Sequence, residues 1–188
     1  MRSVTLAAIV LASVPAFAQQ EYSKQEVSVQ ALGSFVKSTW DKGVQQTATN
    51  SGGVLASYRY FFNKNNGVEA NYAFSTNTQS YGPQGVDTHN NEVSAAYVFR
   101  MPLKHFTPFV LAGVGALVFD PKDFTGASTQ TRAAFVYGAG ADYNLTQHVF
   151  VRAEYRGLVY NSPTYDVFNG LDRTTHRAEP SLGFGYRF

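Results

Sequence analysis

Apolar side chains recur at every second position along most of this sequence, and that period limits the fold more than any other feature. In residues 177–188 the alternation has no exception, and the apolar positions are Ala178, Pro180, Leu182, Phe184, Tyr186 and Phe188. A helix repeats its apolar residues every three or four positions, whereas a β-strand sends successive side chains to opposite faces. The sequence therefore predicts an all-β protein whose strands have one apolar and one polar face.

Seven further segments have the same period, so we expect eight strands. They cover residues 26–40, 54–62, 67–77, 91–100, 106–119, 131–143 and 149–159. Two are less regular, because Leu32 and Val36 fall on the polar side of the first segment and residues 106–119 are apolar on both faces. Each segment has about ten residues, the length that a tilted strand needs to cross a bilayer.

The connections between these segments alternate in length. Residues 63–66, 101–105 and 144–148 form short turns, while residues 41–50, 78–90, 120–130 and 161–175 form longer polar connections. A transmembrane barrel has this asymmetry, with short periplasmic turns at one rim and longer extracellular loops at the other. We therefore expect an eight-stranded antiparallel up-and-down transmembrane β-barrel over residues 26–188.

The first residues have the pattern of a secretory signal peptide. Met1 and Arg2 give a short positive region, Val4–Val14 an apolar run, and Ala16-Phe17-Ala18 a cleavage site of small residues. We expect a signal peptide over residues 1–18, Sec-type export, and a short periplasmic segment over residues 19–25. Although 44% of the residues are hydrophobic, no later stretch approaches the roughly 20 apolar residues that a membrane-spanning helix needs.

The charged residues of the strands gather on the face opposite the apolar one. They are Arg59, Glu69, Glu92, Arg132, Asp142, Arg152, Glu154, Arg156, Arg177, Glu179 and Arg187. If this face lines a lumen, the charges must form a paired network, because an unpaired buried charge is prohibitive. A soluble lipocalin-like barrel or sandwich would instead turn them to water, and it would need far more charge than the 15% found here.

The end of the chain favours the membrane interpretation. Residues Gly183-Phe184-Gly185-Tyr186-Arg187-Phe188 resemble the terminal strand of the eight-stranded outer-membrane β-barrel proteins of Gram-negative bacteria, the OmpA/OmpX-like superfamily. The resemblance implies that the barrel assembly machinery recognises Phe184, Tyr186 and Phe188. It also implies contact with outer-membrane lipid and lipopolysaccharide, a monomer, and no peptidoglycan-binding domain after the barrel. Pro180 departs from the pattern, because it removes a backbone donor from the last strand.

An eight-stranded barrel is just wide enough for side chains to fill it, so we do not expect a general diffusion porin. Outward aromatic rings at both ends would form the interfacial girdles of a lipid-embedded barrel. The predicted girdle residues are Tyr60, Phe62, Tyr97, Phe99, Tyr143, Tyr186 and Phe188 at one rim, and Trp40, Phe74, Phe119 and Tyr160 at the other.

The sequence offers no catalytic or cofactor motif. It has no cysteine, and its histidines lie at turns, connections or strand ends without the serine spacing of lipid A deacylases. No basic run indicates nucleic-acid binding. We therefore expect no enzyme, no cofactor and no nucleic-acid partner.

We expect the residues that determine binding specificity to lie in the long connections, because binding residues concentrate on loops held by a rigid scaffold. Six of the seven aspartates lie there, which suggests a mildly acidic outer rim that recruits divalent cations, although aspartate also simply favours turns. The leading hypothesis is a structural or surface-interaction barrel in envelope integrity or adhesion, with an unidentified loop partner. The alternatives are a narrow gated pore or conduit for a small apolar ligand, and a soluble periplasmic barrel.

Overall fold

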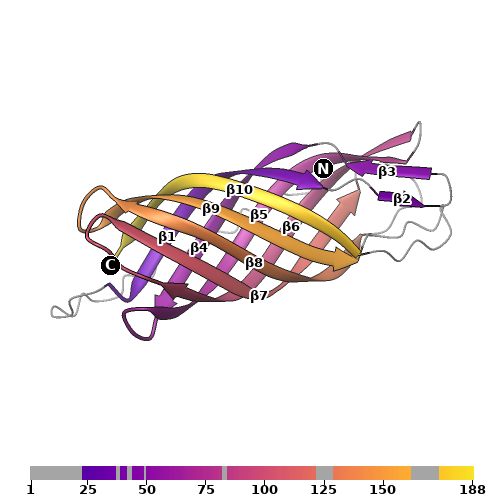
Figure 1. The fold of residues 1–188 in the computed structure, drawn as a ribbon. Helices are drawn as coiled ribbons and strands as arrows, with labels where there is room; N and C mark the ends of the chain where they lie inside the picture. Colours follow the sequence, from indigo (N-terminus) through magenta and orange to yellow (C-terminus); the bar gives the residue numbers. More distant parts are fainter. Residues whose placement is uncertain are drawn as a thin grey trace, which may run out of the picture.

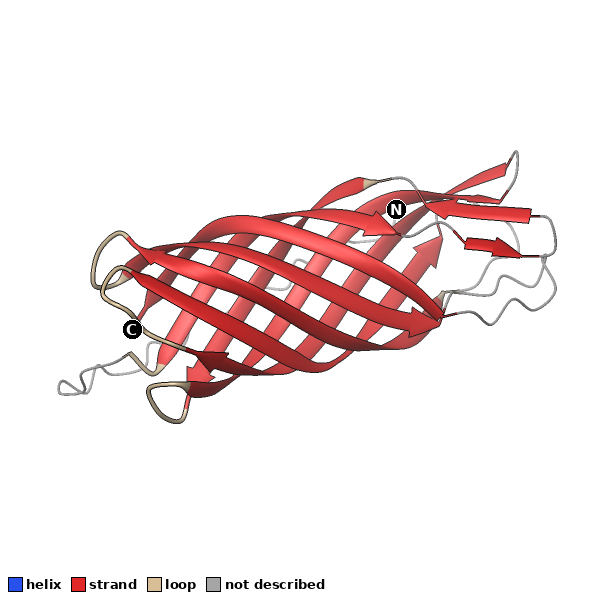
Figure 2. Ribbon diagram, viewed as in Figure 1, coloured by secondary structure: helices blue, strands red, loops and turns tan. Residues whose placement is uncertain are grey.

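The computed structural model describes residues 23–36, 39–41, 44–48, 50–81, 84–121, 129–161 and 174–188 (Figures 1 and 2). The predicted signal peptide, residues 1–18, lies outside the described residues, as does most of the segment 19–25. Within the described part of the chain, no helix is long and apolar enough to cross a membrane.

Eight antiparallel strands form a closed wall. They are β1 (Gln25–Val36), β4 (Ser51–Phe61), β5 (Asn66–Tyr81), β6 (Gln84–Arg100), β7 (Phe106–Pro121), β8 (Gln130–Asn144), β9 (Val149–Asn161) and β10 (Thr174–Arg187). Each strand pairs with its neighbours along the chain, and β10 pairs with β1 to close the ring (Figure 1). The predicted eight-stranded up-and-down barrel is confirmed.

The register of the strands fixes the width of the barrel. Pairing leads from Glu26 around the wall through Arg59, Glu69, Ala96, Gly113, Val136, Leu158 and Arg177. It returns to β1 at Val36, so the closed ladder is staggered by ten residues. Strand number and stagger together set the diameter, and eight strands leave an interior that side chains can fill.

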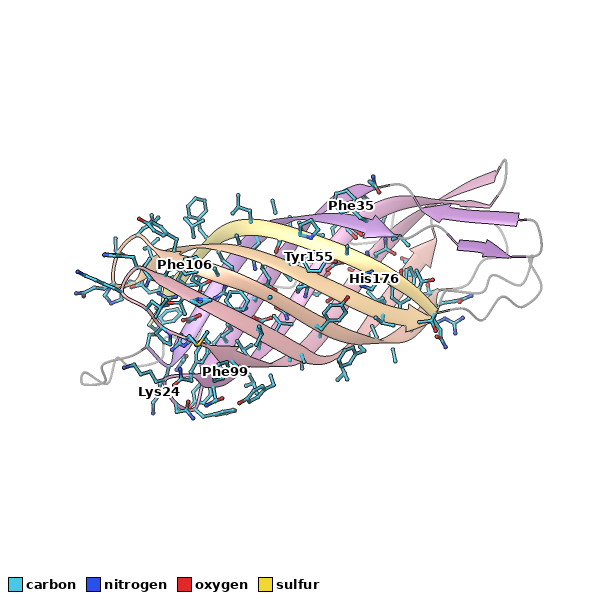
Figure 3. The ribbon with its side chains drawn as sticks, viewed as in Figure 1. Lys24, Phe35, Phe99, Phe106, Tyr155 and His176 are labelled. Carbon is cyan, nitrogen blue, oxygen red and sulfur yellow. The ribbon has the colours of Figure 1, made fainter. Side chains whose placement is uncertain are left out.

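The two faces of the wall are inverted relative to a soluble protein. Arg59, Arg152, Arg156 and Arg177 are among the largest fully buried side chains, and they point into the lumen. Large apolar side chains such as Val29, Val93, Val114, Leu182 and Phe184 are exposed on the outside. Phe35, Phe99 and Phe106 are exposed there as well (Figure 3). Water would favour the opposite arrangement, so this inversion indicates lipid outside the barrel.

The prediction that Phe119 and Tyr160 belong to the lipid-facing girdle was wrong. Phe119 and Tyr160 are only 2% and 5% exposed and point into the lumen, where their ring centroids lie 5.9 Å apart. Residues an even number of positions apart on a strand lie on the same face. Phe119 therefore shares its face with buried Leu117, and Tyr160 shares its face with buried Arg156. Leu32, which fell on the polar side of the first segment, is also buried and packs with Leu55 and Ala73. The side chain of Trp40 lies outside the described residues.

The predicted connection over residues 78–90 was also wrong, because most of it is strand. β5 continues to Tyr81 and β6 starts at Gln84, whereas pairing of β6 with β7 begins only at Thr88. The predicted strand 26–40 is divided, because β1 ends at Val36 and β2 covers Thr39–Asp41. β2 pairs with β3 (Val44–Ala48), which lies within the predicted connection 41–50, and β3 pairs with β5. The strands β2, β3, β5 and β6 therefore form a projecting sheet beyond the wall (Figure 1).

The predicted short turns lie together at the other end of the barrel. Residues 62–65, 101–105 and 145–148 connect β4 to β5, β6 to β7 and β8 to β9. Together with Ser23–Gln25 and Phe188 they form the short-turn rim, which lies opposite the projecting sheet (Figure 1).

Candidate functional site: an ion-paired lumen

The lumen holds six buried arginines and six buried carboxylates among the described residues. Ten of the eleven predicted lumen residues are buried: Arg59, Glu69, Glu92, Asp142, Arg152, Glu154, Arg156, Arg177, Glu179 and Arg187. The eleventh, Arg132, is half-buried, and its Nη2 donates to Gln130 Oε1 at 3.1 Å. Glu26 and Arg100 are also buried in the lumen, and the sequence analysis missed them. Each lies an even number of positions from the buried polar residues of its strand and so shares their face.

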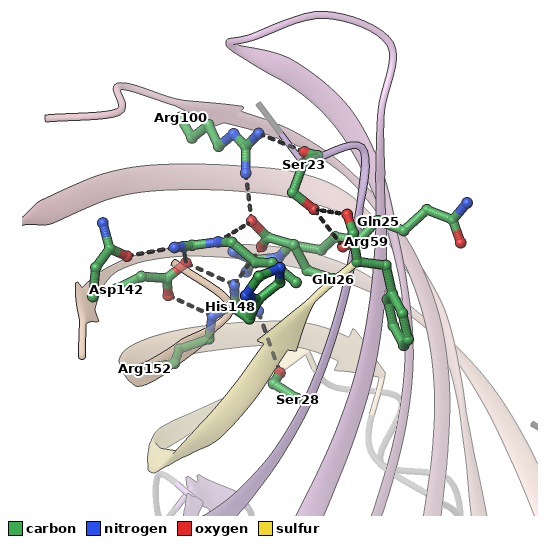
Figure 4. A network of polar contacts seen from close by, with 12 residues as sticks. Ser23, Gln25, Glu26, Ser28, Arg59, Arg100, Asp142, His148 and Arg152 are labelled. Atoms are coloured by element: carbon green, nitrogen blue, oxygen red, sulfur yellow. Dashed lines mark hydrogen bonds and ion pairs between the residues drawn. The ribbon is translucent and has the colours of Figure 1, made fainter. Parts of the chain in front are cut away.

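Glu26 is the centre of a cluster near the short-turn rim (Figure 4). Its Oε1 accepts hydrogen bonds from Arg100 Nη1 and from Arg187 Nε, the latter at 2.8 Å. Its Oε2 accepts from Arg152 Nη2 at 3.0 Å. One carboxylate thus joins arginines of β6, β9 and β10, and such charge-assisted bonds are roughly twice as strong as neutral ones.

Asp142 completes this cluster from β8. It accepts two hydrogen bonds from Arg152, from Nε at 2.7 Å and from Nη2 at 2.9 Å, and a third from Arg187 Nη2 at 3.1 Å. The two parallel bonds to Arg152 have the bidentate geometry that orients a guanidinium most firmly. The cluster therefore fixes its arginines in position and does not merely neutralise them.

A second cluster lies around Arg59. Its Nε donates to Glu69 Oε2 on the neighbouring strand, and its Nη2 donates to Glu154 Oε2 at 3.2 Å. Asn71 Nδ2 donates to the other oxygen of Glu69 at 2.7 Å. Glu154 lies on β9, which does not pair with β4, so the contact with Arg59 bridges the lumen.

The third cluster lies toward the projecting sheet. Arg156 pairs with Glu92 across the lumen, with Nη1 and Oε1 3.1 Å apart, and with Glu179 at 2.5 Å. Arg177 lies 3.2 Å from Glu179, and it donates to Ser34 Oγ at 2.7 Å and to Ser75 Oγ at 3.0 Å. Ser75 belongs to β5 and Arg177 to β10, so this cluster also ties strands that do not pair.

Aromatic rings cover the guanidinium faces that the carboxylates leave free. Arg59 lies 3.9 Å from the ring centroid of Phe109, and Arg100 lies 3.4 Å from that of Phe61. Phe150 contacts both Arg152 and Arg187, at 4.8 Å and 4.3 Å. Cation–π contacts are strongest where the cation is desolvated, as it is here. The lumen is therefore occupied by a charge network and the rings that pack on it.

The comparison with protein families supports this interpretation of the inverted faces. The family model described as "Outer membrane protein beta-barrel domain" matches residues 4–188. This chain belongs to that family. As an outer-membrane β-barrel protein of a Gram-negative envelope it is located in the bacterial outer membrane. Barrels of this kind place their short turns on the periplasmic side, so we expect the short-turn rim to face the periplasm.

Relatives of this outer-membrane β-barrel protein include the 22 kDa outer membrane protein of Rhizobium leguminosarum bv. viciae. The two are 30% identical over 129 residues, which are 65% of this chain and 58% of that protein. The match therefore covers little more than half of the relative.

Three solved structures show the same fold. Neisserial surface protein A (NspA) is 16% identical with a TM-score of 0.67, over 87% of this chain and 97% of that chain. OprG from Pseudomonas aeruginosa is 17% identical with a TM-score of 0.64, over 88% and 96%. Ail, the attachment invasion locus protein of Yersinia pestis, is 24% identical with a TM-score of 0.57, over 88% and 99%.

The predicted assembly residues of this outer-membrane β-barrel protein lie on the lipid-facing side of β10. Phe184, Tyr186 and Phe188 are all exposed, and the Tyr186 and Phe188 ring centroids lie 5.1 Å apart. The backbone N–H of Phe188 donates to Gln25 O at 3.0 Å, which ties the end of the chain to β1. Recognition of these rings by the barrel assembly machinery stays a prediction from the resemblance.

Proposed function

We propose that this protein is a closed, non-enzymatic barrel that acts at the cell surface, in envelope integrity or adhesion, through its projecting sheet. One observation carries the proposal: ion pairs that bridge the lumen, such as Arg59 with Glu154 and Arg156 with Glu92, tie non-neighbouring strands together. A solute would have to separate these buried ion pairs to pass, and a buried charge left without its partner is strongly unfavourable.

The projecting sheet supports a role in surface interactions. β5 and β6 pair without interruption up to Tyr81 and Gln84, and β3 adds to the side of β5. A paired backbone holds its side chains more firmly than an irregular loop, and binding residues act best on a rigid support. Ail, which shares this fold, is an attachment invasion locus protein, and by analogy we extend an adhesive role to this chain.

Conductance tests the closed lumen. We expect refolded protein in planar lipid bilayers to give no steady single-channel current. A stable conductance in the wild-type protein would overturn the closed-barrel part of the proposal and would favour the alternative of a narrow pore.

Two loop replacements of equal length test the surface role. Replacing residues 77–88 by Asn-Gly removes the projecting hairpin beyond the Thr76–His89 pair, and replacing residues 162–173 by Asn-Gly joins β9 to β10 at the Asn161–Thr174 pair. Bacteria displaying each variant are compared for adherence to matrix-coated surfaces and for resistance to detergent. We expect the first replacement to reduce adherence or resistance and the second to leave both unchanged. No effect of the first, or a loss with the second alone, would overturn the role of the projecting sheet.

A further inference from the structure

The short-turn rim exposes positive charge that the lumen network does not use. Lys64 and Lys104 are exposed, and Lys24 is half-buried. The acidic side chains at this end, Glu26 and Asp142, are buried and held by arginines, as described above. No acidic side chain is exposed among the described residues of the rim, and Ser23 Oγ donates to Phe188 O at 2.5 Å.

Exposed apolar side chains lie between these cations. Met101 and Leu103 precede Lys104 in the turn between β6 and β7, and Leu145 lies in the turn that carries His148. Turns that face water seldom expose several large apolar side chains, whereas turns at a bilayer surface place them among the acyl chains. The lysines of the same turns then lie at the level of the lipid headgroups, because long cationic side chains extend toward the polar layer.

The turns of this rim are continuous with the aromatic girdle. The ring of His148 stacks on that of Tyr186, with centroids 5.6 Å apart and an angle of 19° between the planes. The hydroxyls of two exposed tyrosines on the outer face already bond within the protein, since Tyr58 donates to Gln25 Oε1 at 3.1 Å and Tyr97 donates to Asn66 Oδ1. A phosphate at this level meets the exposed ammonium groups of Lys64 and Lys104 in the turns.

We propose that the short-turn rim binds the phosphodiester headgroups of anionic phospholipids, of the phosphatidylglycerol class, in the periplasmic leaflet of the outer membrane. Lys64 and Lys104 supply charge, and Met101, Leu103 and Leu145 insert beside the acyl chains. A lipid satisfies both kinds of side chain at once. An anionic polymer without an apolar part, such as peptidoglycan, would satisfy the charges and leave the apolar side chains in water.

Native mass spectrometry of the full barrel, released from micelles that contain equal amounts of phosphatidylglycerol and phosphatidylcholine, tests this proposal. We expect the wild-type protein to retain phosphatidylglycerol preferentially. Each lysine near an anionic surface contributes roughly a fivefold change in binding. In the double variant K64Q/K104Q, the ratio of bound phosphatidylglycerol to bound phosphatidylcholine should therefore fall by about 25-fold. The heat-modifiable shift on a gel verifies that each variant is folded.

The matched control is K42Q/K122Q, which removes two lysines that do not belong to the short-turn rim. It should keep the preference of the wild-type protein. An equal preference in K64Q/K104Q, or an equal loss in the control, would overturn the proposal. Binding of soluble peptidoglycan fragments that depends on Lys64 and Lys104, with lipid preference unchanged, would assign the rim to the cell wall instead and would also overturn it.

Discussion

Pro180 on β10 lies beside Gly33 on β1, at the point where the ladder that closes the barrel is interrupted. Leu32 pairs with Ser181 and Phe35 with Ala178, while the positions between them are unpaired across this seam. Pairing of Pro180 with Tyr155 on the other side of β10 continues. Proline has no N–H to donate, so its missing hydrogen bond falls on the closing seam. The departure of Pro180 from the strand pattern is thus a local break and does not end the strand.

We expect Pro180→Val to stabilise the barrel. The new N–H can donate to β1, and in a lipid-facing wall a satisfied acceptor is worth more than the roughly 0.4–1 kcal/mol that proline provides by restricting the unfolded chain. The free energy of unfolding, measured by denaturant titration in micelles, should rise by about 1 kcal/mol. Leu182→Val, at the next outward position of the intact ladder, is the control and should not stabilise. A decrease with Pro180→Val would show that the missing donor is not the cause of the break.

The pair formed by Arg59 and Glu69 should behave as one unit. Arg59→Met or Glu69→Met alone leaves a buried charge without its main partner, and we expect each to lower the free energy of unfolding by about 3–5 kcal/mol. The double variant should lose no more than one of the single variants, because it removes both charges together. Asp120→Asn, at an exposed position, should change stability by less than about 0.5 kcal/mol. Additive losses in the double variant would contradict a coupled pair.

Tyr137 covers Gly157 on the lipid-facing side of β8 and β9, and its hydroxyl lies 2.6 Å from His176 Nε2 on β10. A Cβ added at Gly157 would come within 2.7 Å of the Tyr137 oxygen. Gly157→Ala should therefore displace the ring, break its contact with His176 and cost about 1–3 kcal/mol. In a Tyr137→Ala background the same substitution should cost little. An equal cost in both backgrounds, measured by the same titrations, would mean that the ring does not set the requirement for glycine.

The sequence predicts which face of a strand is buried wherever the two faces differ chemically. Arg152, Glu154 and Arg156 alternate with apolar residues, so their common direction follows from the strand period. Glu26 and Arg100 could have been found by extending the same parity to the ends of their strands. Which charges pair could not be predicted, because contacts such as Arg59 with Glu154 depend on the stagger of the whole closed ladder.

The errors in the prediction have two physical causes. Phe119 lies on a strand that is apolar on both faces, so alternation alone does not say which rings meet lipid and which meet the lumen. Residues 78–90 are polar and resemble a loop, but strand pairing between β5 and β6 satisfies the backbone there whatever the side chains are. Composition therefore underestimates how far these two strands extend past the wall.

Phe188→Ala should impair assembly in cells without impairing the folded barrel. The ring is 60% exposed and lies at the end of β10, so its loss removes little packing, while the backbone bond from Phe188 to Gln25 is kept. Phe62→Ala removes a ring of similar exposure, 55%, from a turn of the same rim and is the matched control. We expect the folded, heat-modifiable fraction in outer membranes to fall several-fold for Phe188→Ala only, while both variants refold in micelles as well as wild type. Equal losses in cells would indicate a general girdle effect, and failure of Phe188→Ala to refold in micelles would indicate a structural role in place of recognition by the assembly machinery.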